Sequence, residues 1–319
     1  MKIHSVIKML FVCSFILSLC ACTTKAKLSI DLSGRWLFKI DSMNQGLKEK
    51  WFQDNFSETI NLPGSMAENG KGNDVTVNTH WTGNMWNDSL WYKDPKMKKY
   101  RQKGNVKVPF WLTPVKEYKG SAWYQKTVTI PDSWSNKNIN LHLERVHWES
   151  TVWVDDKEIG MQNSLGTAHN YSLDDVLTVG DHTITIRIDN SIKDINVGLD
   201  AHSISDNTQS NWNGIVGNIL LNASPKAYLK TIKITSEIAN KRITVHAIID
   251  NQSNKDLEGN LTLQAKKLHG NGSDVASKNE KRHLHPAEKR IDNGHSQQRQ
   301  DLPTIKRFVG AVFCYIIVL

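Results

Sequence analysis

Alternation of apolar and polar residues between positions 115 and 190 restricts the fold more than any other feature of this 319-residue chain. Period-two alternation places one set of side chains on a single face of a β-strand. The apolar members are Ile139, Leu141, Leu143, Val152, Val154, Ile184, Ile186 and Ile188. Turn signals such as Pro131-Asp132-Ser133 and Gly180-Asp181 recur about every ten residues, which is typical of an antiparallel sandwich rather than of βαβ units. We therefore expect an all-β protein.

Several motifs in the same order resemble the N-terminal domains of family 2 glycoside hydrolases. They are Leu32-x-Gly34-x-Trp36-x-Phe38, Leu62-Pro63-Gly64-Ser65, the run GSAWYQKTVTIP from Gly120, the run LERVHWESTVWVDDKEIG from Leu143, and Ile186-Arg-Ile-Asp-Asn190. The resemblance implies a jelly-roll, galactose-binding-like sandwich over residues 28–225 and the start of an immunoglobulin-like sandwich over residues 226–267. In the family, a catalytic (β/α)8 barrel follows these domains, and the resemblance stops before it.

The second sandwich is expected to be incomplete. Strands are predicted at Leu229–Thr235, Arg242–Asp250 and Asn260–Ala265, whereas such a sandwich needs about seven. Residues 268–319 then become rich in His, Arg, Gln and Lys, and their low apolar content predicts disorder. His283 and His285 there could suggest a metal site, but a solvated tail is the simpler interpretation. A frameshift near residue 268 is our hypothesis for the change in composition.

The N-terminus has the pattern of a secretory signal, with Lys2 and Lys8 before an apolar run from Met9 to Leu19. That run is shorter than the ~20 residues that a membrane-spanning helix needs. Leu19-Cys20-Ala21-Cys22 resembles a bacterial lipobox, which implies a lipoprotein signal over residues 1–22 in which Cys22 becomes the lipid-bearing first residue; an ordinary signal peptide is the alternative. Both interpretations predict export. The destination is the periplasm or the outer membrane, with a lipid anchor at Cys22 in the lipoprotein interpretation.

Cysteine content and charge exclude several function classes. The four cysteines lie at positions 13, 20, 22 and 314, so we expect no disulfide framework, no thiolate metal site and no metal or other cofactor in the folded body. The net charge of +8 comes mostly from the two ends of the chain. A nearly neutral body argues against nucleic acid as a partner.

Residues 67–118 are irregular and rich in aromatic rings, among them Trp81, Trp86, Trp91, Tyr100 and Trp111. A loop of this length is usually functional or disordered, and its aromatic content argues against disorder. Some rings could stack on a sugar. Alternatively, each could anchor the loop onto the sandwich or a neighbouring domain, and Trp36, Trp123 and Trp153, which lie in predicted strands, are expected to pack in the core.

The resemblance points to residues before a Gly-Ile-x-Gly signature as the substrate-binding candidates. They are Asn211, Trp212 and Asn213, followed by Gln209 and Asp206. Gly214 and Gly217 of the signature are expected to permit positive φ or close backbone approach. Glu117 occupies a position where the β-galactosidase branch of the family has a sugar-binding Asn, and Thr208 one where it has an Asp. Galactose specificity and a sodium ion therefore cannot be transferred to this chain.

No catalytic residues are predicted. Retaining glycosidases need two carboxylates about 5 Å apart; in the family both come from the barrel, and Glu144 and Glu149 are interpreted as ordinary strand residues. The chain is therefore expected to be the non-catalytic N-terminal part of a family 2 exo-β-glycosidase, inactive alone, with carbohydrate and the missing barrel as partners. One alternative is a free-standing carbohydrate-binding lipoprotein, and another is a scaffold without any ligand.

Overall fold

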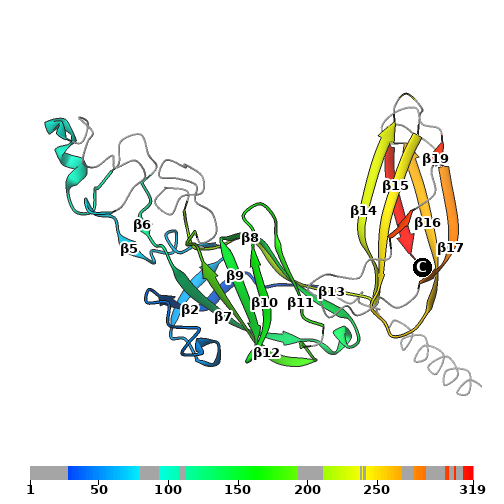
Figure 1. Ribbon diagram of the computed structural model, residues 1–319, viewed down its shortest axis with the longest axis horizontal. Coiled ribbons are helices and arrows are strands. Elements are labelled where there is room, and N and C mark those ends of the chain that lie inside the picture. The colour runs from blue at the N-terminus through cyan, green and yellow to red at the C-terminus, as the bar shows by residue number, and fades with distance from the viewer. Residues whose placement is uncertain are drawn as a thin grey trace, which may run out of the picture.

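The computed structural model describes residues 28–79, 93–107, 113–174, 176–192, 211–237, 239, 242–267, 276–284, 299–301, 305–306 and 312–318. Two β-sandwiches follow one another along the chain (Figure 1). The expected all-β class is confirmed. None of the helices in the described residues is both long and apolar enough to cross a membrane. The segment carrying Cys22 lies outside the described residues.

The first sandwich packs a five-stranded sheet on a six-stranded sheet. The five-stranded sheet has the order β1-β13-β8-β11, with β4 also pairing β13. Its strands are β1 (Ser29–Asp31), β13 (Gly214–Ser224), β8 (Asn138–His147), β11 (His169–Ser172) and β4 (Gly64–Ser65). The six-stranded sheet has the order β10-β9-β12-β7-β2-β3. It contains β10 (Lys157–Asn163), β9 (Glu149–Val154), β12 (Gly180–Asp189), β7 (Ser121–Ile130), β2 (Gly34–Asp41) and β3 (Glu58–Leu62).

The core lies between these two sheets, and the predicted alternation builds it. The apolar residues of the runs 139–143, 152–154 and 184–188 are all buried there. Leu32, Trp36 and Phe38 join them, each with 1% of its surface exposed. Because every pairing in the two sheets is antiparallel, successive strands place their alternate residues on the same side. The sequence prediction for this core is confirmed.

The outer face of the six-stranded sheet is also covered. Residues 42–57, which include the short helix η1 (Trp51–Gln53), lie across it. Phe52 stacks on Trp153 with ring centroids 5.3 Å apart, and Trp153 stacks on Trp123 at 5.2 Å. The indole N–H of Trp123 donates to Asp41 Oδ2 at 3.0 Å. Trp123 and Trp153 are therefore packing residues, as predicted, but on the outer face rather than between the sheets.

Two glycines of the Gly-Ile-x-Gly signature shape strand β13. Gly214 has φ +146°, and a Cβ there would collide with the backbone of Gly64 in β4. Gly217 has φ +77° and lies in a register shift between Val216 and Ile219, where a Cβ would collide with the Glu144 carboxylate. The expectation that these glycines permit positive φ and close approach is confirmed.

The second sandwich begins with β14 (Ala227–Glu237), β15 (Arg242–Asn251) and β16 (Leu257–Lys267). These strands occur where the sequence predicts them. The segment 268–319, expected to be disordered, differs from that expectation in its described parts, because β17 (Ala276–Leu284) and β20 (Val312–Val318) pair with the two edges of β16. The short strands β18 (Arg299–Asp301) and β19 (Ile305–Lys306) pair with β15.

Charged cross-strand contacts contribute to the pairing of β17, whose apolar content is low. In β17, Lys281 Nζ lies 2.5 Å and His283 Nε2 2.9 Å from the carboxylate of Glu258 on β16. Opposite charges on paired strands favour pairing. His285 lies outside the described residues.

An arm extends from the first sandwich between β3 and β7. Its base is the two-stranded ribbon of β5 (Asn73–Asp74) and β6 (Lys116–Glu117), and its outer part contains the helix η3 (Pro95–Arg101) (Figure 1). Most of the loop aromatics of the sequence analysis, including Trp81, Trp86, Trp91 and Trp111, fall outside the described residues. The question of whether they bind sugar therefore stays a prediction.

Candidate functional site

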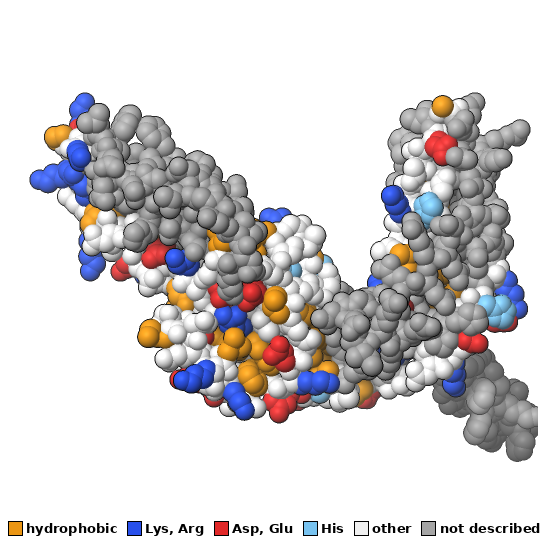
Figure 2. All heavy atoms as spheres, in the orientation of Figure 1, with side chains coloured by type: hydrophobic (Ala, Val, Ile, Leu, Met, Phe, Trp, Pro, Cys, Tyr) orange, Lys and Arg blue, Asp and Glu red, His pale blue; other side chains and the backbone are white. Residues whose placement is uncertain are grey.

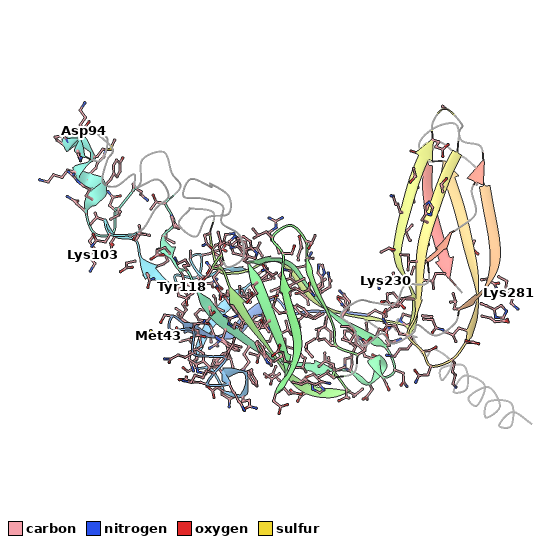
Figure 3. All side chains as sticks on the ribbon, in the orientation of Figure 1. Met43, Asp94, Lys103, Tyr118, Lys230 and Lys281 are labelled. Atoms are coloured by element: carbon pink, nitrogen blue, oxygen red, sulfur yellow. The ribbon has the colours of Figure 1, made fainter. Side chains whose placement is uncertain are left out.

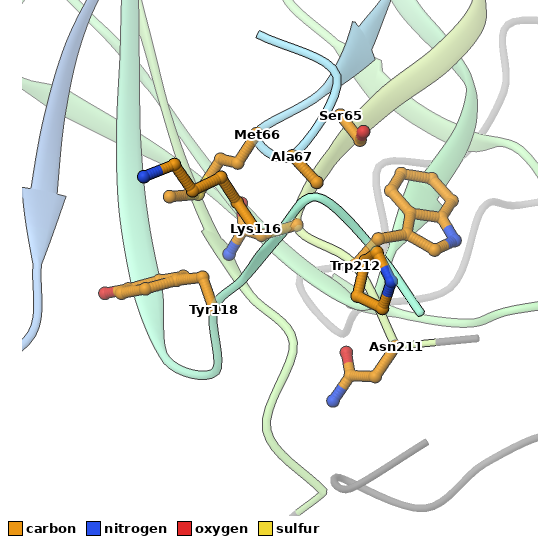
Figure 4. A pocket seen from close by; sticks show the side chains of 9 residues that line it. Ser65, Met66, Ala67, Lys116, Tyr118, Asn211 and Trp212 are labelled. Carbon is orange, nitrogen blue, oxygen red and sulfur yellow. The ribbon is translucent and has the colours of Figure 1, made fainter. Parts of the chain in front are cut away.

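A pocket of about 210 Å³ opens at the start of strand β13. Three chain segments form it: the turn after β4, the strand β6, and the residues that lead into β13 (Figure 4). Its lining consists of Ser65, Met66, Ala67, Pro114, Lys116, Tyr118, Asn211, Trp212 and Asn213. The structure therefore brings together Asn211, Trp212 and Asn213 of the residues predicted from sequence.

Trp212 is the half-buried aromatic residue of this pocket. Its ring stacks on His147, with centroids 5.0 Å apart and an interplanar angle of 28°. The same histidine bonds through Nδ1 to the Trp212 carbonyl at 2.8 Å. Burial lowers the pKa of His147 and outweighs the opposing effect of this bond, so the ring is neutral at pH 7 and its Nδ1–H donates. His147 thus covers one face of the indole, and the same indole lines the pocket.

Asn213 is fixed by the protein itself. Its side-chain oxygen accepts the Tyr124 hydroxyl at 2.7 Å, and its amide nitrogen donates to the carbonyls of Gly120 (2.9 Å) and Ile188 (3.1 Å). Only 1% of its surface is exposed. An amide with these bonds has little capacity left for a sugar hydroxyl. Asn213 therefore positions the loop that carries Trp212.

Asn211 is held by Asn190 at the end of β12. Asn190 Nδ2 donates to Asn211 Oδ1 at 2.7 Å, and Asn211 Nδ2 donates to the Asn190 carbonyl at 3.3 Å. Asn190 itself is fully buried and also binds the backbone of Gly120 and Tyr118. This explains the Asn at the end of the Ile-Arg-Ile-Asp-Asn run: it ties the strand to the pocket.

The other polar residues of the lining were not predicted. Lys116 forms an ion pair with Asp74 at 2.5 Å, and its hydrogen bond and charge lower the pKa of that carboxylate. The Tyr118 hydroxyl donates to the Ser121 carbonyl at 2.6 Å, and its burial raises the pKa of the phenol. Ser65 and Met66 belong to or follow the Leu-Pro-Gly-Ser signature, which is the sequence signal that could have placed them at the site.

Glu117 lies beside the pocket but does not line it. It follows Lys116 in β6, and successive residues of a strand point to opposite faces. Asn73 Nδ2 donates to its Oε1 at 3.4 Å. Asp206 and Gln209 lie outside the described residues, so their proposed role stays a prediction.

A buried ionic cluster lies at the same end of the six-stranded sheet, on its outer face. Arg187 binds Glu149 at 3.1 Å, Asp189 at 2.9 Å, the Ser121 hydroxyl and the Asn44 amide oxygen. The Arg187 side chain is 4% exposed and those of Glu149 and Asp189 are 13% and 6% exposed. The sequence signal for this cluster was the pair of opposite charges, Arg187 and Asp189, two residues apart on the polar face of an alternating strand.

Glu144 and Glu149, the two strand carboxylates considered in the sequence analysis, have structural partners. Glu149 bonds to Arg187, while Glu144 Oε2 accepts from both the backbone N–H and the amide of Asn218, each at 2.7 Å, at the register shift of β13. Both residues thus have the structural role that the sequence analysis gave them. Among the described residues, no group of three His, Cys, Asp or Glu side chains is placed to hold a metal ion.

This geometry defines a β-sandwich with a small, partly aromatic pocket at one end of its sheets. Residues 84–225 match the family model for the sugar binding domain of glycosyl hydrolases family 2. The matched segment includes Asn211, Trp212 and Asn213. The resemblance seen in the motifs is therefore confirmed.

Known proteins agree with this match. A β-glucuronidase of Paenibacillus borealis is 25% identical over 129 residues, which are 40% of this chain and 15% of that protein. Among solved structures, a family 2 member from Bacteroides cellulosilyticus superimposes with a TM-score of 0.59 at 14% identity, covering 91% of this chain and 33% of its own. A β-glucuronidase of an uncultured Clostridium gives 0.54 at 17% identity, covering 89% and 45%. The chain thus corresponds to the N-terminal part of such glycosidases and spans less than half of each.

Proposed function

We propose that this chain is the non-catalytic part of a family 2 exo-β-glycosidase, whose pocket around Trp212 helps to form the substrate subsite beside a separate catalytic barrel. The observation that carries the proposal is the pocket itself, because most of its lining lies in the segment that matches the sugar-binding domain and includes the half-buried indole of Trp212. An aromatic ring beside polar side chains such as Ser65 and Lys116 suits a sugar, which has an apolar face and a polar rim.

Two further observations support a docked partner domain. Val115, at the pocket rim between Pro114 and Lys116, leaves 75% of its surface exposed. At the same end of the six-stranded sheet, the carboxylates of Glu149 and Asp189 are both paired with Arg187 and are 13% and 6% exposed. They are a poor pair for glycoside hydrolysis, which needs one protonated and one free carboxyl group facing the substrate.

The first experiment compares the purified chain with an enzyme in which a barrel is restored. Sequencing across the codons for Gln264 to Gly272 and the DNA beyond tests the frameshift hypothesis and would supply the barrel. We expect no hydrolysis of nitrophenyl β-glucuronide or β-galactoside by the chain alone and hydrolysis by the joined protein. In that protein Trp212→Ala should lower kcat/KM about tenfold, the value of one aromatic contact. Hydrolysis by the chain alone would contradict the proposal.

The alternative is a free-standing carbohydrate-binding lipoprotein. It is favoured if the downstream DNA encodes no barrel in any frame and if the isolated chain binds a glycan saturably, with loss of binding in Trp212→Ala. The sugar affinity of the isolated chain distinguishes the two proposals. In the first proposal the pocket is only half of a subsite, so sugar binding by the chain alone should be weak.

Export and lipidation at Cys22 are part of the proposal. The chain enters the first sandwich at β1, where Ser29 pairs with Asn222, at the opposite end of β13 from Gly214 and the pocket. An anchor before β1 would therefore leave the pocket directed away from the membrane. Cys22→Ser should move the protein from the membrane fraction to the soluble periplasmic fraction, and unchanged fractionation would contradict the anchor.

A further inference from the structure

The outer part of the arm, residues 93–107, carries a concentration of positive charge that we call the basic arm. It contains seven Lys or Arg residues and one carboxylate, Asp94. Elsewhere in residues 28–268 the balance is reversed, with 21 Lys or Arg against 26 Asp or Glu. The nearly neutral total of residues 28–268 therefore hides a local cationic surface on an otherwise acidic body.

Helix η3 arranges these cations in rows. In a 3₁₀ helix, residues three apart lie above one another, separated by about 6 Å along the axis. Lys96 and Lys99 form one such pair, and Lys98 and Arg101 form another. The four lysines at 93, 96, 98 and 99 are exposed, and blue side chains project from this end of the molecule (Figure 2). Figure 3 shows Asp94 at the outer end of the arm, well away from Tyr118 at the pocket, with Lys103 between them.

Much of this positive charge has no paired carboxylate in the part of the chain that the structure describes. No ion pair joins Lys96 or Lys98 to a described carboxylate, while the pKa of Asp74 at the base of the arm is lowered mainly by Lys116 and also by the charge of Lys103. Asp94 serves as the N-cap of η3, where its Oδ1 accepts the backbone N–H of Lys96 at 2.8 Å. Lys99 lies 4.9 Å from the centroid of the Tyr100 ring. Cations held at this density with their ammonium groups in solvent attract a polyanion.

The larger apolar residues of the basic arm are partly or fully buried. Val106 is buried, and Met97 and Tyr100 are half-buried. Insertion into a bilayer requires a helix with an exposed apolar face, which the basic arm lacks. Recognition here is therefore by charge at a surface.

The ribbon at the base of the arm connects this surface to the pocket. Lys116 in β6 lines the pocket and pairs with Asp74 in β5, and η3 lies between these two strands in the chain. The arm whose outer part carries the cations therefore also forms part of the pocket rim at its base. A polymer bound to the basic arm would contact this same arm.

We infer that the basic arm is a docking surface for an anionic polysaccharide, one bearing carboxylate or sulfate groups along its chain. The positive charge of the basic arm and the exposure of its lysines support the binding of a polyanion. The choice of a polysaccharide rests on the proposed function, because the pocket would take a sugar unit of the same polymer. The arm would raise the local concentration of polymer near the pocket without contacting the bond that is cleaved.

The test measures binding of the purified chain to heparin and to polygalacturonate, with neutral dextran as the uncharged control. We expect binding to both polyanions, weakening steeply with added salt, and none to dextran. The triple variant Lys96→Glu, Lys98→Glu, Lys99→Glu should lose at least tenfold in affinity. The matched control is Lys48→Glu, Lys157→Glu, Lys255→Glu, which makes the same change in net charge at exposed lysines on other elements and should lose less than twofold.

Three outcomes would overturn the inference: equal loss in both triple variants, affinity for dextran equal to that for the polyanions, or tighter binding to phosphatidylserine vesicles or single-stranded DNA than to either polysaccharide. The proposed function has a separate readout. In the barrel-restored enzyme, the arm variant should keep its kcat/KM for a small nitrophenyl glycoside, whereas Trp212→Ala should lower it. Polyanion affinity therefore tests only the inference about the basic arm. An unchanged kcat/KM in the Trp212→Ala enzyme would contradict only the proposed function of the pocket.

Discussion

The two faces of the six-stranded sheet are both buried, but by different means. On the inner face, Ile184, Ile186 and Ile188 of β12 pack into the apolar core between the sheets. On the outer face, the alternate residues Thr185, Arg187 and Asp189 of the same strand are almost as buried, yet they are polar or charged. Apolar packing tolerates exchange among residues of similar volume, whereas a buried ionic network depends on every partner. The outer face should therefore be the more sensitive of the two to single substitutions.

The largest effect is expected for Arg187→Met. Removing the guanidinium leaves Glu149 and Asp189 buried without their cation, which costs about 3–5 kcal/mol. Urea unfolding followed by tryptophan fluorescence measures this, because all eleven tryptophans lie between residues 36 and 212. Lys157→Met on the exposed edge strand β10 is the control and should change the unfolding free energy by less than about 0.5 kcal/mol. A loss below 1 kcal/mol for Arg187→Met would mean that the cluster is dispensable.

Trp123→Phe should have the next largest effect on the outer face. The substitution removes the indole N–H that binds Asp41 and weakens the stack on Trp153, at a cost of about 1–3 kcal/mol. Trp51→Phe is the matched control, since the Trp51 indole N–H bonds only to Glu49 in an exposed position. Equal effects of the two changes in the same urea experiment would argue against a buried role for the Asp41 bond.

Ile186→Val tests the inner face. Loss of one methylene from a fully buried site should cost about 1 kcal/mol. The exposed Val179 provides the comparison, and Val179→Ala should be nearly neutral. If Ile186→Val proves more costly than Arg187→Met, the contrast between the two faces is reversed.

A smaller effect is expected from pH. Burial lowers the pKa of His147 and of His169, although backbone hydrogen bonds partly oppose it. A histidine whose folded pKa is depressed takes up its proton more readily when unfolded, so stability is complete above the unfolded pKa of about 6.5 and falls as the pH drops below it. We expect the melting temperature to decrease between pH 7.5 and 5.5, and His169→Gln to flatten that decrease. Parallel curves for the two proteins would exclude His169 as a cause.

The smallest change in stability belongs to Trp212→Ala. Trp212 lies at the pocket rim, and its carbonyl can still accept the bond from His147 after truncation. We expect a loss of about 0.5 kcal/mol or less in the urea experiment, together with the loss of activity or binding described above. Trp123→Phe should show the opposite pattern, lower stability with an unchanged pocket.

The sequence was most informative in the strands where apolar and polar residues alternate, because this alternation decides which side chains are buried. Leu141, Val152 and Ile186 could be assigned to one core because alternation alone decides which face of a strand is covered. Gly214 and Gly217 were also predictable, since few residues other than glycine accept positive φ. The strands β17 and β20 were not, because β17 has too few apolar residues to show alternation and β20 pairs with β16 across more than forty residues.

The pocket was only partly predictable for a similar reason. Trp212 and Asn211 follow from a local motif, but Lys116 and Tyr118 reach the pocket through the pairing of β5 with β6, across more than forty residues. The internal role of Asn213 could not be read from its neighbours in the chain, because its partners, Tyr124, Gly120 and Ile188, come from β7, the turn before it, and β12.

The position of β1 beside the far end of β13 also determines how the molecule would respond to mechanical load. The chain enters at Leu28, whose carbonyl accepts the N–H of Ala223, and leaves toward the second sandwich just after Ser224. A pull between these two points would separate β1 from β13 one pair at a time, beginning at Ser29 and Asn222, because the two strands run antiparallel from that end. Gly214 and the pocket lie at the other end of β13, outside the path of the force, so tension along the chain would detach an edge strand before it disturbed the site.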